Sequence, residues 1–261
     1  MDASTIRFTV FISVLLICAI TEHYRPQRPL SQPKAFRWLN NLGLTSVNAL
    51  VLYCTMPLLA IEAALWVQQH QFGLTYWLGL PMPVSLVLTV IALDCAIYWQ
   101  HRLFHSWSIL WHLHKVHHAD QDLDVTSGAR FHPIEIWLSM WIKITLVIAL
   151  GISPLAVIIF EVLLNATAMF NHSNINLPAY IDKPLRKLLV TPDMHRVHHS
   201  TQRSETDSNF GFCLSIWDRI FNSYISQPAL GHQKMHIGIS RFRDPQEQRL
   251  DKMLTQPFRN K

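Results

Sequence analysis

Long apolar runs separated by polar stretches dominate the first two thirds of the chain. They cover residues 8–20, 44–67, 84–98 and 134–169. The run at 44–67 is long enough to cross a bilayer, which needs roughly 17–25 residues. The run at 84–98 gains that length by continuing into the "WQHRLFH" that follows it. The run at 8–20 is shorter, and we expect a retained membrane anchor there. A cleaved signal peptide is the alternative, although Asp2 and Arg7 leave its start without net positive charge.

The fourth run is interrupted by "GISP" at 151–154. Proline favours the start of a helix over its interior, so this run predicts two antiparallel helices joined by a tight turn. From residue 174 onwards the chain is mostly polar and loop-like. The expected fold is an all-α integral membrane bundle with a helical cap. The expected segments are an N-terminal anchor at 1–83, a catalytic core at 84–227 and a polar C-terminal tail at 228–261.

Composition supports a membrane location, since 50% of the residues are hydrophobic and 15% are charged. The net charge of +5 comes without a basic run of the kind that nucleic acids bind, which argues against a nucleic-acid partner. The four cysteines lie far apart and form no disulfide or C-x-x-C pattern, so we interpret them as small hydrophobic residues.

Lys and Arg residues predict which ends of the helices share a side of the membrane. The loops at 68–83 and 151–154 contain no Lys or Arg, whereas residues 25–37 and the histidine-rich regions contain many. Under the positive-inside rule, the basic regions lie together on the cytoplasmic side. The histidines are therefore expected at the cytoplasmic face of a bacterial inner membrane or an ER-type membrane. Lys143, inside the last run, either snorkels or belongs to the cap.

The fifteen histidines are the compositional anomaly, and the phrase H-x-x-H-H occurs twice, in "HLHKVHH" (112–118) and "HRVHH" (195–199). On a helix, histidines spaced i, i+3 and i+4 share one face. This spacing selects His114, His117 and His118 in the first phrase and excludes His112. In the second phrase it selects His195, His198 and His199.

A further pair, His101 and His105, is spaced i, i+4 and follows Asp94 and Tyr98 along one helical stripe. These two imidazoles can converge on one ion. An unpaired carboxylate deep in a membrane is costly. Asp94 is therefore expected to accept an imidazole N–H and fix the tautomer of that ring.

Two isolated histidines are harder to assign. His172 in "FNHSNIN" lies on the same helical face as Glu161, Asn165 and Met169, and we favour it as a ligand. For His132, which precedes Pro133, a metal ligand and an ordinary structural histidine are equally good interpretations. With His172 the candidates number nine, which is too many for one ion and suits two ions with four or five imidazoles each.

Imidazole ligands suit iron, zinc, copper or nickel. A structural zinc site needs four ligands and gains nothing from a second ion. Two redox metals beside a bilayer favour oxygen activation on a lipid chain, with the metal supplying most of that chemistry. A zinc-dependent membrane hydrolase is the alternative, although no H-E-x-x-H is present. A bis-histidine haem protein and a metal transporter fit the clustering less well.

The pieces "HRLFH", "HKVHH", "SGARFHPIE", "NHSNINLP", "TPDMHRVHH" and "SNFGFCLSIWDRIFNSY" follow one another in this order. Over residues 85–227 the chain resembles the sterol desaturase and fatty acid hydroxylase superfamily of membrane-bound non-heme di-iron oxygenases. The resemblance implies hydroxylation or desaturation of a lipid with two iron ions and O2. Zinc competes for such ligands in purified protein.

The resemblance implies a metal-ligand set of nine histidines: His101, His105, His114, His117, His118, His172, His195, His198 and His199. Some relatives have another histidine where this chain has Asn176, so Asn176, His132 or a water is the candidate for one remaining position. Asn209 is expected to hold a ligand imidazole through its amide. Asp218 and Arg219 are either family-like site residues or a surface ion pair.

Other features concern the surroundings of the site. Trp99, Trp107 and Trp111 flank the first two histidine motifs and are expected at the membrane interface. No haem, flavin or iron–sulfur motif is present, so a separate electron donor of the reductase, ferredoxin or cytochrome type is expected.

Overall fold

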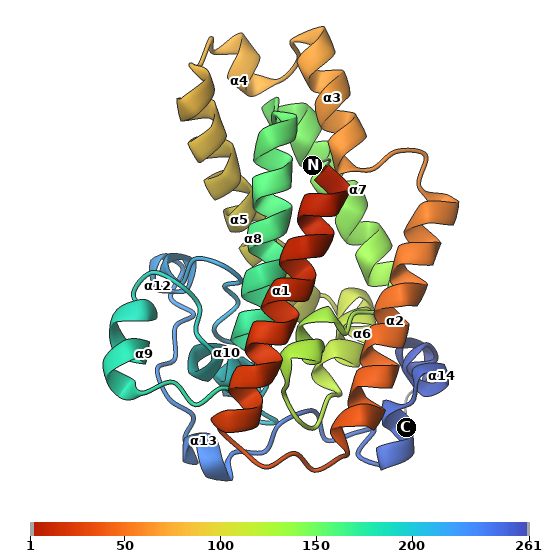
Figure 1. Cartoon of the computed structure of the whole chain (residues 1–261), viewed down its shortest axis with the longest axis vertical. Helices are drawn as coiled ribbons and strands as arrows, with labels where there is room; N and C mark the ends of the chain where they lie inside the picture. Colours follow the sequence, from red (N-terminus) through yellow and green to blue (C-terminus); the bar gives the residue numbers. More distant parts are fainter. Residues whose placement is uncertain (1–2, 260–261) are drawn as a thin grey trace.

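The computed structural model describes residues 3–259, and all regular secondary structure in that range is helical. Figure 1 shows an elongated bundle of long helices that stands on a cap of short helices and loops. The long helices are α1 (Ala3–Tyr24), α2 (Lys34–Thr55), α3 (Ala60–His70), α5 (Met82–Ser106), α6 (Ser108–His118), α7 (Pro133–Leu150) and α8 (Pro154–His172). The short helices are α4 (Leu74–Trp77), η1 (Val125–Ala129), α9 (Ala179–Leu185), α10 (Pro192–His198), α11 (Arg203–Thr206), α12 (Ile216–Ile220), α13 (Gly231–Lys234), η2 (Pro245–Gln248), α14 (Leu250–Met253) and η3 (Gln256–Phe258).

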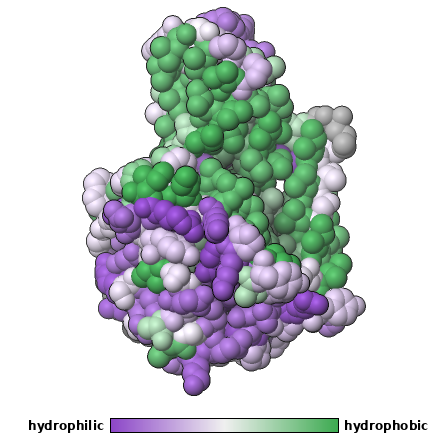
Figure 2. Space-filling view, turned by 90° about the vertical axis from the view of Figure 1, so that its left-hand side faces the viewer, coloured by the Kyte–Doolittle hydropathy of each residue, from purple (hydrophilic) through white to green (hydrophobic). Residues whose placement is uncertain are grey.

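Four helices, α1, α5, α7 and α8, are long and apolar enough to cross a membrane, and the bent pair formed by α2 and α3–α4 can add a fifth span. Figure 2 shows the consequence on the surface, where an apolar upper region lies above a predominantly polar cap. The predicted all-α membrane bundle with a helical cap is therefore confirmed.

The helix expected at 8–20 is longer than its apolar run and covers Ala3–Tyr24. Arg7 on α1 forms an ion pair with Glu161 on α8. At the other end, Glu22 accepts hydrogen bonds from the backbone N–H groups of Val125 and Asn174, each at 2.7 Å. These contacts make α1 an integral helix of the bundle.

The run at 44–67, predicted to be long enough to cross a bilayer, forms two helices and not one continuous helix. The chain leaves the helix after Thr55, with Met56 in an extended conformation, and α3 begins at Ala60. The break contains Pro57, which cannot donate a backbone hydrogen bond and disfavours the helical conformation of the residue before it. The α2 axis and the α3–α4 segment consequently differ in direction by 42°.

The predicted hairpin at 151–154 is confirmed. Gly151 ends α7 with φ +74°, a left-handed conformation that glycine adopts without strain. Ser153 then caps α8 by accepting from the backbone N–H of Ala156, and Pro154 occupies the first turn. The Thr75 hydroxyl donates to the carbonyl of Gly151 at 2.6 Å. The two loops without Lys or Arg therefore meet at the end opposite the cap, which agrees with the relative positions that the charge pattern predicts.

The apolar core of the bundle lies between α3, α5, α7 and α8. Small residues on α3 allow these helices to approach closely, and larger side chains from the other three fill the space between them. The buried members are Ala60, Ala63, Ala64, Leu93, Ile144, Val147, Ile152, Ala156, Val157 and Phe160.

A buried ion network attaches the cap to the start of α2. The Arg37 guanidinium contacts Asp120 at 2.5 Å and Asp124 at 2.6 Å, and all three side chains are almost fully buried. Burial alone would raise the pKa of Asp120, but Arg37 and Arg130 bring it down to about 2. The network fixes the loop that leads from α6 to η1.

The C-terminal segment packs against this cap. Met235 and Ile237 form a cluster with Leu123, while Met253 packs against Leu44 and Val116. The polar tail that the sequence suggests thus contributes buried apolar residues to the cap. The division of the chain into segments at residues 83 and 227 stays a prediction.

We expect Arg37→Ala to destabilise the protein by about 3–5 kcal/mol, because it leaves the buried carboxylate of Asp124 without its ion-pair partner and Asp120 with only Arg130, at 3.9 Å. Thermal or denaturant unfolding in detergent measures the change. Arg249→Ala is the control, since its pair with Asp251 is exposed and is worth less than about 1 kcal/mol. Equal effects of the two substitutions would contradict the role assigned to Arg37.

Candidate metal centre

Nine buried histidines converge where the bundle meets the cap. They form two groups, and within each group one ligand atom per residue lies within 4.8 Å of every other. The five-histidine cluster consists of His101, His105, His114, His118 and His198. The four-histidine cluster consists of His117, His172, His195 and His199.

Each H-x-x-H-H phrase is divided between the two clusters. In the first phrase, His114 and His118 belong to the five-histidine cluster, whereas His117 belongs to the four-histidine cluster. The second phrase has the opposite division, with only His198 in the five-histidine cluster. On a helix, the histidine at i+4 lies about 40° from the one at i, and the histidine at i+3 lies on the opposite side of i. The adjacent histidines at i+3 and i+4 can therefore face two neighbouring ions.

Five of the nine rings make a hydrogen bond through Nδ1. Four donate to backbone carbonyls: His101 to Phe210, His117 to Arg130, His172 to Ala168 and His198 to Ser208, over 2.7–3.1 Å. His114 Nδ1 lies 2.6 Å from a carboxylate oxygen of Glu135. A carbonyl can only accept, so Nδ1 holds the proton and Nε2 is left with a lone pair.

These lone pairs face one another at short range. The Nε2 atoms of His117 and His172 are 3.0 Å apart, although both rings already donate through Nδ1. No hydrogen bond can join two acceptors, so this contact is repulsive unless a cation lies between them. His195 Nε2 is 3.0 Å from His172 Nε2 and 3.3 Å from His199 Nε2. The donor set therefore fits bound metal ions better than a network of hydrogen bonds.

The rings are also in the protonation state that metal binding requires. Burial lowers the pKa of His114 to about 3. Burial, followed by the neighbouring imidazoles, lowers the pKa of His117 and His199 well below the usual value. Neutral imidazoles keep their lone pairs available to a metal at any physiological pH.

Three residues that the sequence brought into consideration lie outside the clusters. His112, which the spacing excluded, donates to Ser108 on its own helix. His132 caps α7 by accepting from the backbone N–H of Ile134 and also lies 3.2 Å from the Leu254 carbonyl. Asn176 is exposed on the loop after α8, where its backbone N–H donates to Arg25. His132 therefore lies outside both histidine clusters, and the Asn176 side chain is exposed whereas the clustered histidines are buried.

The hydrogen bond expected from an imidazole to Asp94 is a further correction. The Asp94 carboxylate instead accepts from the backbone N–H groups of Cys213 and Leu214 and from the Trp217 indole, at 2.8–3.3 Å. Asp94 faces the loop between α11 and α12, and the rings of His101 and His105 lie further along α5. Its action on the site is therefore indirect.

Asn209 lies in the same loop and Asp218 in α12, which follows it, and neither forms a hydrogen bond with an imidazole. The Asn209 amide donates to the carbonyls of Met194 and Ile225. Asp218 is fully buried and accepts from the backbone N–H groups of Phe210 and Gly211 at 2.8 and 2.9 Å. Asp218 is thus no surface ion pair. It positions the carbonyl of Phe210, which in turn orients His101.

The residues that sequence reasoning missed are those that orient the rings. Glu135 is recognisable only in retrospect, as the acidic residue in the first turn of the helix after "RFHP". Backbone carbonyls leave no trace in a sequence. Gly128 is another residue that sequence reasoning missed. A Cβ at this position would lie 2.5 Å from the Ala168 carbonyl oxygen that orients His172, so a larger residue would disturb that ring. Trp111, expected at the membrane interface, packs its ring 5.0 Å from that of His105.

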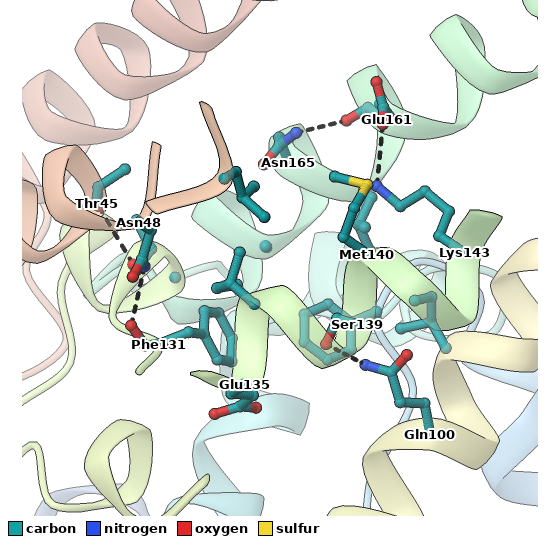
Figure 3. A pocket seen from close by; sticks show the side chains of 18 of the residues that line it. Thr45, Asn48, Gln100, Phe131, Glu135, Ser139, Met140, Lys143, Glu161 and Asn165 are labelled. Carbon is teal, nitrogen blue, oxygen red and sulfur yellow. Dashed lines mark hydrogen bonds and ion pairs between the residues drawn. The ribbon is translucent and has the colours of Figure 1, made fainter. Parts of the chain in front are cut away.

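A cavity of about 400 Å³ lies beside the five-histidine cluster, between α1, α2, α5, α7 and α8 (Figure 3). His101 and His114 form part of its wall, next to Phe104, Phe131 and Phe212. The cavity therefore connects the apolar bundle to the histidines.

Comparison with known proteins agrees with this geometry. The "Fatty acid hydroxylase" family model matches residues 86–223. An ornithine lipid hydroxylase of Rhizobium tropici is 26% identical over 84% of this chain and 67% of its own length. The alkylglycerol monooxygenases of Xenopus tropicalis and Homo sapiens are each 30% identical, over 72% and 70% of this chain. The chain spans about two fifths of the length of these two monooxygenases, 41% and 40%. No solved structure matches the chain.

We expect Asp94→Asn and Glu135→Gln to have different effects. Asp94→Asn weakens two hydrogen bonds to the loop and one to Trp217 on α12, and should cost about 1–3 kcal/mol of stability, with the metal content of the folded protein unchanged. Glu135→Gln weakens the partner of His114 and should lower metal affinity by about 10–100-fold. Unfolding curves and chelator competition measure the two effects. A loss of metal affinity in Asp94→Asn without a loss of stability would contradict this assignment and support a direct hydrogen bond between Asp94 and an imidazole.

Proposed function

Because the chain belongs to the fatty acid hydroxylase family, we propose that it is a membrane-bound di-iron oxygenase that hydroxylates, or desaturates, a lipid substrate with O2. The observation that carries this proposal is the position of the two histidine clusters. One of them forms part of the wall of a cavity that lies among the apolar helices. A lipid can reach such a site without leaving the membrane.

In this proposal the five-histidine cluster holds one iron ion and the four-histidine cluster holds the other. The four-histidine cluster would offer its ion one imidazole fewer than the five-histidine cluster. Bound iron supplies the activation of O2 that cleavage of an unreactive C–H bond requires. Zinc binds the same ligands and is expected to compete for them during purification.

The chain's own residues bind the substrate, orient the rings and exclude water. Phe104, Phe131 and Phe212 present apolar surface to a lipid chain beside His101 and His114. The carbonyls and the carboxylate that accept from Nδ1 hold the imidazoles in place before substrate binds. All nine histidines are at most 6% exposed, so bulk water does not reach the centre.

The relatives support a lipid substrate, since their names specify an ornithine lipid and alkylglycerols. The proposal also includes a separate electron donor of the reductase, ferredoxin or cytochrome type. We further propose that the cap and its histidines lie on the cytoplasmic side, in a bacterial inner membrane or an ER-type membrane.

The decisive experiment supplies purified, iron-loaded protein in lipid nanodiscs with a chemical reductant, 18O-labelled O2 and candidate lipids. We expect two metal ions per folded chain and O2-dependent product, with label in any hydroxylated product. His114→Ala should abolish turnover, because the other imidazoles cannot complete its ligand set. His112→Ala, which lies outside both clusters, should keep most of the activity and serves as the matched control.

Elemental analysis and mass spectrometry of the lipids provide the two measurements. One ion or fewer per folded chain would refute the two-metal site. Turnover that continues without oxygen would replace the oxygenase with a zinc-dependent hydrolase. Normal turnover in His114→Ala together with an inactive His112→Ala would show that the wrong helical face was assigned.

The positive-inside pattern gives a separate prediction about topology. Single cysteines introduced at exposed positions of the 68–83 loop should react with a membrane-impermeant reagent from outside the cell. Cysteines in the exposed part of α11 should react only after the membrane is opened. Labelling of both sites from the same side would contradict the proposed arrangement.

A further inference from the structure

The cavity beside the five-histidine cluster contains polar groups that a hydrocarbon chain would not need. Figure 3 shows Asn48 and Glu135 around the part of the cavity next to Phe131, with Lys143 and Glu161 at the opposite end. Asn48 is 6% exposed and Glu135 is 4% exposed. Buried polar atoms in proteins almost always have hydrogen-bond partners, so each one without a partner needs an explanation.

Asn48 on α2 presents a carbonyl oxygen without a partner. Its amide nitrogen donates to the backbone carbonyl of Phe131 at 2.9 Å. Because that carbonyl can only accept, the orientation of the amide is fixed by chemistry. Asn48 Oδ1 is then left buried with no hydrogen-bond partner.

Glu135 on α7 presents a second unpaired acceptor. One of its carboxylate oxygens accepts from His114 Nδ1, and the other, Oε2, is buried with no partner. The unpaired oxygen therefore lies one side chain away from a member of the five-histidine cluster. Any group that bonds to it is held close to the reactive centre.

The charged residues at the opposite end of the cavity differ in this respect. Arg7 and Lys143 both pair with Glu161, the latter pair at 3.0 Å. Lys143 lies two helical turns after Glu135, roughly 12 Å along α7. The charges at that end satisfy one another. The unpaired side-chain oxygens in the cavity wall belong to Asn48, Glu135 and Gln100, and of these Glu135 contacts a histidine of the five-histidine cluster.

We propose that the cavity binds a polar lipid head group. Its hydroxyl, amide or ammonium groups donate hydrogen bonds to Asn48 Oδ1 and Glu135 Oε2. This proposal rests on the proposed oxygenase function and specifies its substrate class. The oxidised carbon then lies in the head group or next to it. A chain bound by its middle would displace water from both acceptors and leave them unpaired, at a cost in binding.

The size of the cavity agrees with this substrate class. About 400 Å³ lies in the lower part of the roughly 300–1,000 Å³ range of small-molecule sites. That volume suits a head group and the adjoining part of a chain. The remainder of a long lipid would extend between the apolar helices.

Matched lipids with and without donors test the proposal. The probes are 1-O-hexadecylglycerol, an ornithine lipid, and hexadecyl propyl ether, which is the first lipid with both hydroxyls replaced by hydrogen. Binding is measured as the shift in Tm of the purified, metal-loaded protein, and turnover is measured with O2 and a chemical reductant. We expect at least one donor lipid to bind and react about 10–100-fold better than the ether, as expected for loss of hydrogen bonds to buried acceptors.

Two variants locate the recognition. Asn48→Leu should reduce the preference for the donor lipid by about 10–100-fold, without changing the metal content. Asn165→Leu removes an amide at the other end of the cavity, where Asn165 donates to the Glu161 carbonyl. It should keep the preference. Loss of the preference in Asn165→Leu, with Asn48→Leu unaffected, would overturn the assignment.

The wild-type result distinguishes this proposal from the proposed function, even if a variant fails to fold. O2-dependent turnover of the ether at the same rate as both donor lipids would overturn the head-group proposal and leave the oxygenase intact. Preferential binding of a donor lipid without O2-dependent turnover would support head-group recognition and overturn the oxygenase.

Discussion

The convergence of nine imidazole nitrogens in a buried space is the constraint on which the rest of the structure depends. Backbone carbonyls fix the proton on Nδ1 in four of the rings, so their Nε2 lone pairs point inwards, and some lie 3.0 Å from another ring nitrogen. Such an arrangement fits bound metal ions better than a network of hydrogen bonds. Under the proposed function, folding of the cap and metal binding would be coupled, as in other proteins whose ligands come from distant segments.

The surrounding architecture holds the acceptors that orient the rings. Arg37 and its buried aspartates fix the loop before η1, and the carbonyl of Arg130, directly after η1, accepts from His117. Asp94 and Asp218 fix the loop that contains Ser208 and Phe210, whose carbonyls accept from His198 and His101. Buried charges at these two places are costly unless they are paired or hydrogen-bonded. Here they are satisfied, and they determine the backbone positions on which the centre depends.

The histidine centre lies at the base of the bundle, between the membrane-facing helices and the water-facing cap. On one side the histidines meet apolar helices, and on the other they are enclosed by a cap with a polar outer surface (Figure 2). Hydrocarbon offers no hydrogen bonds, so every polar atom that lines the cavity must be paired by the protein or by the ligand. The unpaired oxygens of Asn48 and Glu135 therefore favour a ligand that has hydrogen-bond donors, and they would hold those donors near the histidines.

The sequence by itself determined the all-α membrane fold, the hairpin at 151–154 and the nine histidines, because apolar length, Gly-Ser-Pro signals and i, i+3, i+4 spacing are local properties. It could not show that each H-x-x-H-H phrase serves both clusters, because that depends on how α5, α6, α8 and α10 pack around one another. Nor could it assign Asp94, Asn209 and Glu135 correctly. Their partners are backbone groups or rings on segments up to about 120 residues away in the sequence, and only the folded chain brings those groups within hydrogen-bond distance.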